Sequence, residues 1–505
     1  MKRLACHSLL LACAAPVISE PPLQTNAVDE KVEAPPPVVD RTQAPAAGAE
    51  AELRLPRVER FALSSGLEVR LAERHALPLA SVVLVVRGAG SDADPHRKAG
   101  LAALTADLLD EGTARRSALA LADDVAMLGA SLETGCDWDA ATVRLDTLVR
   151  TLASSLEIFG EVVSAPALSA RELDRVKADR LTRIVEERAE PQVVARNVLA
   201  ASIYGERHPY GWPAIGRHAS LRALRRADVV DFHRRRFAAS HATLIVVGDV
   251  TRAVIEPMLE RVLGAWRGTG GRAGAPAAPP QAPGPSGPRL VLVDREGAPQ
   301  SEVRVGHASV PRDHADRAAL DVLEAVLGGT FSSRLNNRLR EQLGFTYGVY
   351  SRFELRRGAG PLVAGGAIKT EHTAEAIREL FAEIARVRDK PVGDAELAKA
   401  RSSVVRSLPA RFEAGSDVAS ELAVLAVHDL PDDFFANYAR AVVAVSASDL
   451  GRVARAHLDP PRLVVVVVGD RKAVEPGLAA LGLGAITVRD VEGASPRPKG
   501  RGHAR

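Results

Sequence analysis

The chain has 505 residues, of which 46% are hydrophobic and 26% are charged, and this composition is typical of a folded protein with two to four domains. The formal net charge is only +3, and no long block of lysine and arginine occurs, so the composition indicates no nucleic-acid partner. Three cysteines are too few to predict a disulfide framework or a cysteine-based metal site.

The N-terminus has the pattern of an export signal. A positive start, Met1–Arg3, precedes the mostly apolar stretch Leu4–Ala15, which is too short to span a bilayer. Leu10–Cys13 resembles a bacterial lipoprotein cleavage box, which would place a lipid on Cys13. A signal cut without lipidation and a wrongly assigned start are the alternatives. We therefore predict a signal or lipoprotein signal over 1–19 and export to the periplasm or a lipid-anchored place in the bacterial envelope.

A disordered tether is predicted over residues 20–52, which are rich in proline and alanine. The first folded domain is expected over 53–267. Its predicted elements are a hairpin at Arg60–Leu71, a buried strand at Ala80–Arg87, helices at Lys98–Asp110, Asp146–Ser164, Ala170–Ala189 and Ala227–Arg236, and a strand at Thr243–Val247.

The sequence at the end of this domain is repeated later in the chain. The segment from Asp228 to Asp249 recurs 221 residues further on as the segment from Asp449 to Asp470, without a gap. A helix and a strand ending in Gly-Asp repeat in register, which indicates an internal duplication. The Gly- and Pro-rich stretch 268–288 is then a linker between two similar domains.

The second domain is expected over 289–488, with a basic, solvated tail at 489–505. Its predicted elements are strands at Arg289–Asp294, Gln300–Gly306 and Pro361–Ile368, and helices at Ala315–Leu327, Thr373–Val387 and Asp394–Ala414. Long helices over alternating strands in both halves predict an α+β fold of two homologous domains, each a mostly antiparallel sheet with helices packed on one face.

The stretch Gly328–Tyr350 (GGTFSSRLNNRLREQLGFTYGVY) carries the most information about function. A helix is predicted that places Phe331, Leu335, Leu339 and Gln342 on one face, with Arg338 at its edge. An arginine beside an apolar stripe is usually a structural ion pair or packs its stem. Strand-like alternation of aromatic residues follows the helix, and a strand edge can bind an extended peptide.

This stretch resembles the second domain of the pitrilysin and mitochondrial-processing-peptidase family of zinc peptidases, the inverzincins. The family form S-R-L-x-x-x-L-R-E-x-x-G-x-x-Y-x-V is matched from Ser333 to Val349. The resemblance implies that one arginine and one tyrosine of this segment bind the substrate backbone. We carry these roles to Arg338 and Tyr347, with Arg340 and Phe345 as the alternatives.

The corresponding helix of the first domain lacks the family's zinc site. Where the family has G-x-A-H-x-x-E-H-x-x-x-x-G-T, Gly100–Thr113 keeps the glycine, alanine, glycine and threonine frame. The two metal histidines are replaced by Ala103 and Asp107, and the general-base glutamate is replaced by Ala106. Catalytic zinc takes three protein ligands, so Asp107 alone cannot hold it. No metal is expected in this chain, and these three positions are degenerate zinc-site positions.

Three further features have plain interpretations. Glu186 and Glu187 lie about where the family's distal glutamate ligand falls, but they are more simply two surface glutamates. His208 belongs to an H-P-Y-G turn that the family shares, and is expected to be structural. Cys136 has no histidine near it in sequence, although sequence distance alone does not exclude one in space.

The resemblance implies a non-catalytic, substrate-binding subunit of a heterodimeric zinc endopeptidase. Some family members divide the work between a chain with H-x-x-E-H, which holds the zinc, and a chain that has lost it but keeps the arginine and tyrosine. The alternative is a non-enzymatic peptide-binding or scaffold protein of the envelope. A peptidase that acts alone by another chemistry stays open as a third interpretation.

Overall fold

A computed structural model describes residues 55–268, 280–284 and 289–494. The predicted signal, Cys13 and the tether lie outside the described residues, as do most of the predicted linker and residues 495–505 of the tail. Within the described residues, no helix combines the length and the apolar character that a membrane crossing needs.

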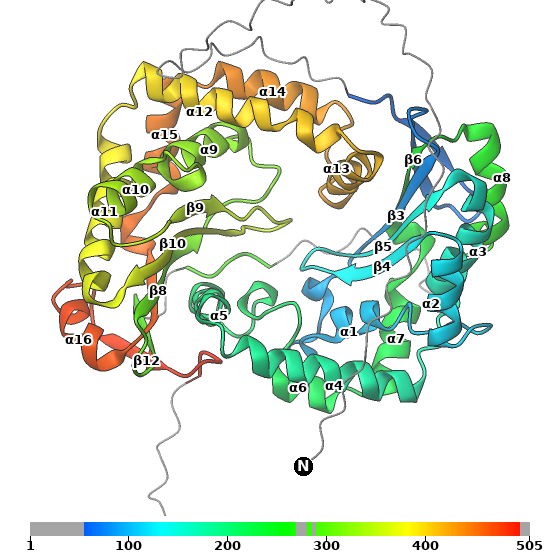
Figure 1. The fold of residues 1–505 in the computed structure, drawn as a ribbon, viewed down its shortest axis with the longest axis horizontal. Helices are drawn as coiled ribbons and strands as arrows, with labels where there is room; N and C mark the ends of the chain where they lie inside the picture. Colours follow the sequence, from blue (N-terminus) through cyan, green and yellow to red (C-terminus); the bar gives the residue numbers. More distant parts are fainter. Residues whose placement is uncertain (1–54, 269–279, 285–288, 495–505) are drawn as a thin grey trace, which may run out of the picture. The chain divides into compact units, whose positions relative to one another are not determined.

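The first half is built on a mixed six-stranded sheet (Figure 1). The strand order is β1-β2-β6-β3-β5-β4, and every neighbouring pair is antiparallel except β2 and β6. The strands are β1 (Glu59–Ala62), β2 (Glu68–Glu73), β3 (Leu79–Arg87), β4 (Ser131–Cys136), β5 (Ala140–Leu148) and β6 (Ala242–Gly248). The order leaves β4 as an edge strand, whose outer backbone groups are open to pairing.

Helices from the same half cover one face of this sheet. Alternate residues of the central strands, such as Val82 and Leu84 of β3 and Val246 of β6, point into this core and are fully buried. The helices are α1 (Leu101–Asp107), α2 (Ala118–Met127), α3 (Leu152–Ser164), α4 (Ala170–Glu187), α6 (His218–Ala223), α7 (Arg226–Arg236) and α8 (Arg252–Leu263).

The second half repeats this design. Its sheet has the order β12-β7-β11-β8-β10-β9, in which the two pairs made by β7 are parallel and the other pairs antiparallel. The strands are β7 (Leu290–Asp294), β8 (Gln300–Ala308), β9 (Tyr350–Phe353), β10 (Pro361–Lys369), β11 (Val464–Gly469) and β12 (Ile486–Arg489). The bounds of β8 and β10 are those of β3 and β5 shifted by 221 residues, which is the offset of the sequence repeat.

Helices of the second half also lie on one face of its sheet and enclose a second core. They are α9 (Arg317–Glu324), α10 (Arg334–Asn336), α11 (Thr373–Asp389), α12 (Asp394–Ser407), α14 (Phe434–Ala444), α15 (Ala447–His457) and α16 (Arg471–Ala479). Short π-helical turns extend α9 over Ala325–Gly329 and α10 over Asn337–Gln342. The α+β prediction with two similar domains is confirmed.

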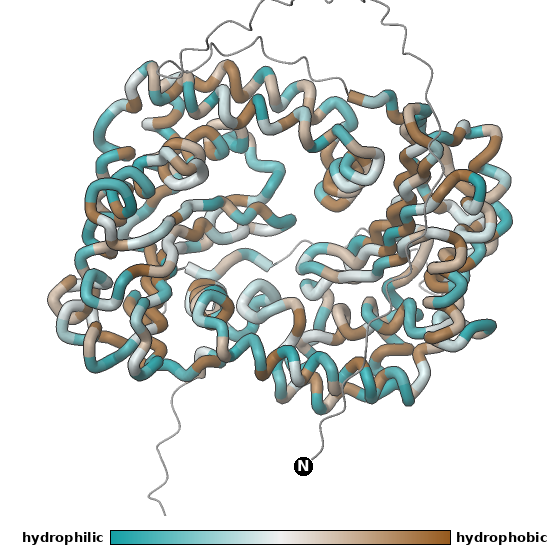
Figure 2. The backbone as a smooth tube through the Cα atoms, in the orientation of Figure 1, coloured by the Kyte–Doolittle hydropathy of each residue, from teal (hydrophilic) through white to brown (hydrophobic). Residues whose placement is uncertain are grey.

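Two further helices, which the sequence analysis did not predict, cover the opposite faces of the sheets. Helix α13 (Gly415–Val427) belongs to the second half but packs on β3 and β6 of the first. Helix α5 (Pro191–Tyr204) belongs to the first half but packs on β8 and β11 of the second. Figure 2 shows the hydrophobic residues of α13 beside the hydrophobic strands of the first sheet. Each sheet is therefore buried on both faces.

Two local predictions were wrong. Residues Asp146–Leu148, predicted as the start of a helix, are the end of β5, because they continue its antiparallel ladder with β3. Phe345–Val349, predicted as a strand, is irregular, and β9 begins only at Tyr350. In this segment side chains replace the ladder: Thr346 Oγ1 donates to Ala367 O, and Asn336 Oδ1 accepts from the Val349 N–H.

The stability of the second half is expected to depend on the pH through Glu324. Burial raises the pKa of this carboxyl from its usual value to about 7, although it accepts a hydrogen bond from the Phe353 N–H at 2.8 Å. A raised pKa in the folded state means that this contribution to stability is present below about pH 4.5 and is lost as the pH rises through about 7. Relative to Glu324→Gln, the wild type should lose about 2–3 kcal/mol of unfolding free energy between pH 5 and pH 8. Urea unfolding at several pH values measures the difference, and parallel curves for the two proteins would contradict it.

A degenerate metal pocket and an exposed arginine–tyrosine segment

The helix that carries the degenerate zinc-site positions is held firmly at its start. Buried Asp94 accepts hydrogen bonds from the backbone N–H groups of Gly100 and Ala102, at 2.6 and 2.8 Å. Burial raises the pKa of Asp94 to about 7. Gly100 has a φ of 94° and approaches Ile215 O so closely that a Cβ would lie 2.8 Å from that oxygen. The start of α1 and the carbonyl of Ile215 are thereby fixed beside each other.

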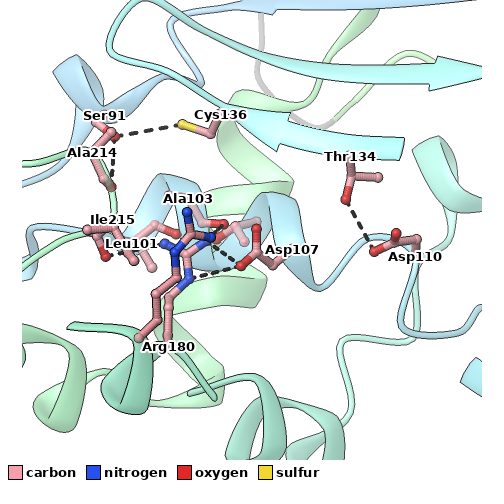
Figure 3. Close-up of polar contacts among 12 residues, drawn as sticks. Ser91, Leu101, Ala103, Asp107, Asp110, Thr134, Cys136, Arg180, Ala214 and Ile215 are labelled. Carbon is pink, nitrogen blue, oxygen red and sulfur yellow. Dashed lines mark hydrogen bonds and ion pairs between the residues drawn. The ribbon is translucent and has the colours of Figure 1, made fainter. Parts of the chain in front are cut away.

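An arginine from α4 enters the place beside Ala103 and Asp107. Figure 3 shows the Arg180 side chain reaching towards α1. Its Nε donates to Asp107 Oδ2 at 2.9 Å, and its Nη2 donates to Asp107 Oδ2 and, at 3.0 Å, to Ala103 O. Its Nη1 donates to Ile215 O at 3.2 Å. Only 9% of Arg180 is exposed, so four hydrogen bonds satisfy a nearly buried guanidinium.

These contacts explain chemically why the three positions do not form a zinc site. Ala103 and Ala106 are buried and have no donor atom, so Asp107 is the single side-chain ligand that α1 offers. That carboxylate already neutralises a cation, Arg180, which lies where a metal bound to these positions would have to sit. A zinc ion there would be repelled by the guanidinium and would lack the three protein ligands that catalytic sites have.

Of the two glutamates considered as distal ligands, Glu186 is exposed and Glu187 lies on the cavity wall described below. The ion pair of Glu187 is with Arg183, at 3.3 Å. Neither glutamate therefore adds a ligand to Asp107 in the described structure.

The degenerate site opens into a cavity of about 650 Å³. Edge strand β4 forms part of its wall through Thr134, Gly135 and Cys136. The other walls carry both charges. The charged side chains are Asp107, Asp110, Glu111, Asp179, Glu187, Arg175, Arg180, Arg183 and Arg196. A polar cavity beside a free strand edge can accept an extended peptide without metal chemistry.

Replacing Arg180 with alanine is expected to lower the free energy of unfolding by about 2–3 kcal/mol. The change leaves Asp107 without its ion-pair partner and removes one hydrogen-bond donor each from Ala103 O and Ile215 O. Arg183→Ala is the matched control: its side chain is 71% exposed and pairs with Glu187, so the loss should stay below about 1 kcal/mol. Chemical denaturation of both variants measures the effect. Equal losses would show that Arg180 is not the structural replacement for a metal.

In the second half, the structure separates the two arginines that were considered. Arg338 Nε donates to Glu379 Oε2 at 2.7 Å and its Nη2 donates to Glu379 Oε1 at 3.1 Å, so Arg338 faces α11. Asn336 Oδ1, two residues earlier, holds the Val349 N–H. Residues two apart lie on opposite sides of a helix. Arg338 is therefore turned away from the segment that carries Tyr347.

Arg340 lies on the other side of this helix. It follows Asn336 by four residues, so it shares the face against which residues 345–349 are held. Its guanidinium carbon lies 3.9 Å from the centre of the Phe331 ring, and Phe331 is 68% exposed. The sequence analysis placed Phe331 on one helix face with Leu335 and Leu339. The helix begins only at Arg334, so Phe331 lies before it and stacks with Arg340 at the surface.

The two aromatic candidates also differ. Phe345 is 5% exposed and stacks on His372 with ring centres 4.1 Å apart, so it is part of the second core. Tyr347 is 89% exposed. Of the two, Tyr347 is the one that can contact another molecule.

Two residues weighed in the sequence have structural surroundings. His208 is buried, accepts a hydrogen bond from the Tyr210 N–H at Nδ1 and lies 2.9 Å from Pro280 O at Nε2. Burial raises the pKa of the Cys136 thiol, and its sulfur contacts Ser91 Oγ and the carbonyls of Ala89 and Asp137. These contacts include no histidine that could activate the thiol.

Sequence reasoning missed Arg180. The sequence pattern did indicate that Arg180 is buried, because Arg180 falls at helical spacing in the apolar stripe of Leu173, Val176 and Ile184. All four residues are buried in α4. A charged residue in a buried stripe requires a partner, and Asp107 on α1 could have been proposed as that partner.

Two family models match the chain. "Insulinase (Peptidase family M16)" matches residues 69–210, and "Peptidase M16 inactive domain" matches residues 223–404. A solved structure from Pseudomonas fluorescens, described as a peptidase M16 inactive domain, has a TM-score of 0.76 and 25% identity. The match covers 82% of this chain and 98% of that one.

Curated relatives include proteins named as peptidases and as a non-peptidase. An uncharacterized zinc protease of Mycobacterium tuberculosis is 29% identical over 81% of this chain and 92% of its own length. Two relatives come from Helicobacter pylori. Zinc protease PqqE is 25% identical over 81% of this chain and 92% of its own, and non-peptidase homolog YmxG is 23% identical over 79% and 91%.

Proposed function

Because the chain belongs to the peptidase M16 family and is of the type without a zinc site, we propose that it is the substrate-binding subunit of a two-chain zinc peptidase. The partner carries H-x-x-E-H, the zinc ion and the general base. The observation that carries the proposal has two parts. The Arg180–Asp107 pair occupies the degenerate zinc-site positions of the first half, and the second half carries the partly buried Arg340 and the exposed Tyr347.

The open cavity beside the degenerate zinc-site positions supports a role beyond a structural one. Arg180 replaces the metal without filling the cavity of about 650 Å³ beside β4. Two relatives from Helicobacter pylori, one named a zinc protease and one a non-peptidase homolog, are compatible with a division of work between two chains in one organism. The partner of the present chain would be of the first kind.

Within the complex, we assign substrate binding to Arg340 and Tyr347 in place of Arg338 and Tyr347. Arg340 lies on the helix face that holds the segment of Tyr347, whereas Arg338 is engaged by Glu379. A guanidinium and a phenol on one side of a segment can donate to carbonyl oxygens of an extended peptide. These residues orient the peptide for the partner's chemistry and do not break the bond themselves.

The proposal includes a place in the envelope. The apolar start and Leu10–Cys13 predict export, with lipidation of Cys13 tying the complex to a membrane. Residues 20–52, the tether predicted from the sequence, would then connect the lipid to the folded body. Mass spectrometry of the mature N-terminus tests this part separately.

Affinity capture of this chain from its native envelope tests the assembly. We expect a co-purifying chain of similar size that contains H-x-x-E-H, and peptide cleavage by the eluate that a chelator abolishes. Recovery of the chain by itself, without chelator-sensitive cleavage, would instead support the non-enzymatic peptide-binding or scaffold protein.

A further inference from the structure

Three side chains with metal-binding atoms meet on the second half, where the start of α9 lies beside the end of α15. His314 and Asp316 stand in the turn before α9, and His457 is the last residue of α15. One ligand atom from each lies within 4.8 Å of the other two. Among the described residues, no second group of three or more such side chains meets this criterion.

The distances suit a small cation. His457 Nε2 lies 2.9 Å and His314 Nδ1 lies 3.9 Å from Asp316 Oδ2. Nitrogen and oxygen ligands of zinc lie about 2.0–2.2 Å from the metal, which separates two ligands of a tetrahedral site by roughly 3.3 Å. The two imidazole rings cross edge to face, with centres 5.1 Å apart. His314 Nδ1 accepts a hydrogen bond from the Asp316 N–H at 3.1 Å, so a rotation of the His314 ring that breaks this bond would bring the three side chains to one ion.

One carboxylate oxygen at this place remains available to a cation. Arg452 donates to Asp316 Oδ1 at 2.7 Å, so one oxygen of this carboxylate already takes part in an ion pair. Arg452 uses Oδ1, so Oδ2 is the oxygen that faces the two histidines. The Arg452 side chain is 55% exposed and can move towards solvent if a metal binds.

The three side chains are partly accessible to solvent and come from packed parts of the fold. The side chains of His314, Asp316 and His457 are 32%, 16% and 14% exposed, so solvent reaches the group while the backbone around it is packed. Asp316 stands at the N-terminus of α9, where the helix dipole favours its negative charge. Two ligands are thus presented from the turn that begins α9, and the third from the last residue of α15.

We propose that His314, Asp316 and His457 bind a divalent transition-metal ion of the zinc class, which links α9 to α15. Two imidazoles and one carboxylate favour such ions over magnesium or calcium, which prefer oxygen ligands alone. Three protein ligands leave the fourth position to water. The site lies wholly in the second half and is independent of the peptidase partnership and of the degenerate zinc-site positions.

The full chain, stripped of metal by a chelator, is titrated with Zn²⁺ by calorimetry and with Co²⁺ by visible absorption. We expect one equivalent to bind at micromolar or lower concentration, with a cobalt spectrum of mixed nitrogen and oxygen ligands. The double variant His314→Gln/His457→Gln should bind at least tenfold more weakly. Asp316→Asn, which keeps a polar residue at the start of α9, should weaken binding similarly and serves if the double variant does not fold.

Two controls separate this site from chance binding. Arg452→Ala removes the competing cation and should tighten Zn²⁺ binding several-fold. His75→Gln removes an exposed histidine that contacts the carboxylates of Asp249 and Glu73, and should leave the affinity unchanged. Failure of the full chain to bind Zn²⁺ saturably, or equal affinity in the wild type and Asp316→Asn, would overturn the proposal.

Discussion

Arg340→Ala in the assembled two-chain peptidase is expected to lower kcat/KM for a peptide substrate by about ten- to hundredfold. A charge-assisted hydrogen bond to a substrate carbonyl contributes roughly 1.5–3 kcal/mol, and misplacement of the scissile bond adds to the loss. Arg340 stacks on the exposed Phe331 ring, so the variant should keep its fold and its partner. Peptide cleavage and size-exclusion chromatography of the same complex measure the two properties separately.

Arg338→Ala is the matched control, since it removes the same side chain two residues away. Its guanidinium pairs with Glu379 of α11, so cleavage should stay near the wild-type rate. Tyr347→Phe should lower cleavage less than Arg340→Ala, because it removes a hydroxyl and keeps the ring. If Arg338→Ala lowers cleavage while Arg340→Ala does not, the original assignment from the family resemblance is correct and the present one is wrong.

Restoring the two histidines of the first half should not restore zinc binding unless Arg180 is also removed. The variant A103H/D107H still places a buried guanidinium beside the intended metal, and at 4 Å a unit charge interacts with another by about 4 kcal/mol near a protein surface. Adding Arg180→Ala should therefore tighten Zn²⁺ binding at least tenfold. Both variants are titrated in a background with His314→Gln and His457→Gln, so that the site on the second half does not contribute.

This comparison tests whether the arginine or the missing histidines keep the metal out. Equal affinity of the variants with and without Arg180 would show that the guanidinium moves aside without cost. The contacts of Arg180 with Ala103 O and Ile215 O make that outcome unexpected, because both carbonyls would then lose their donor.

The sequence predicted the two-domain α+β fold because its signals are periodic and local. Alternation in the segment of β3 and the recurrence of Gly248 as Gly469 are visible without tertiary information. The helices α5 and α13 were not predicted. Each packs on the sheet of the other half, and this is a tertiary contact that the local sequence does not indicate. Phe345–Val349 was misassigned because aromatic alternation also suits a segment held by Thr346 and Asn336 side chains.

The candidate sites were also predicted only in part from the sequence. The loss of the metal histidines was visible at Ala103 and Asp107, since it needs only a comparison of residue types. The sequence did not show that Arg180 occupies this place, because Arg180 lies on another helix and contacts Asp107 only in the folded chain. The choice between Arg338 and Arg340 depended on the direction of a helix face, which the contacts of Glu379 and Asn336 determine.

The most direct test of the central claim is reconstitution from purified chains. Peptide cleavage is measured for this chain alone, for an H-x-x-E-H chain from the same cell alone, and for an equimolar mixture. We predict no cleavage by this chain, little by the second chain, and chelator-sensitive cleavage at least tenfold faster in the mixture. Unchanged cleavage by the H-x-x-E-H chain when this chain is added would contradict the account.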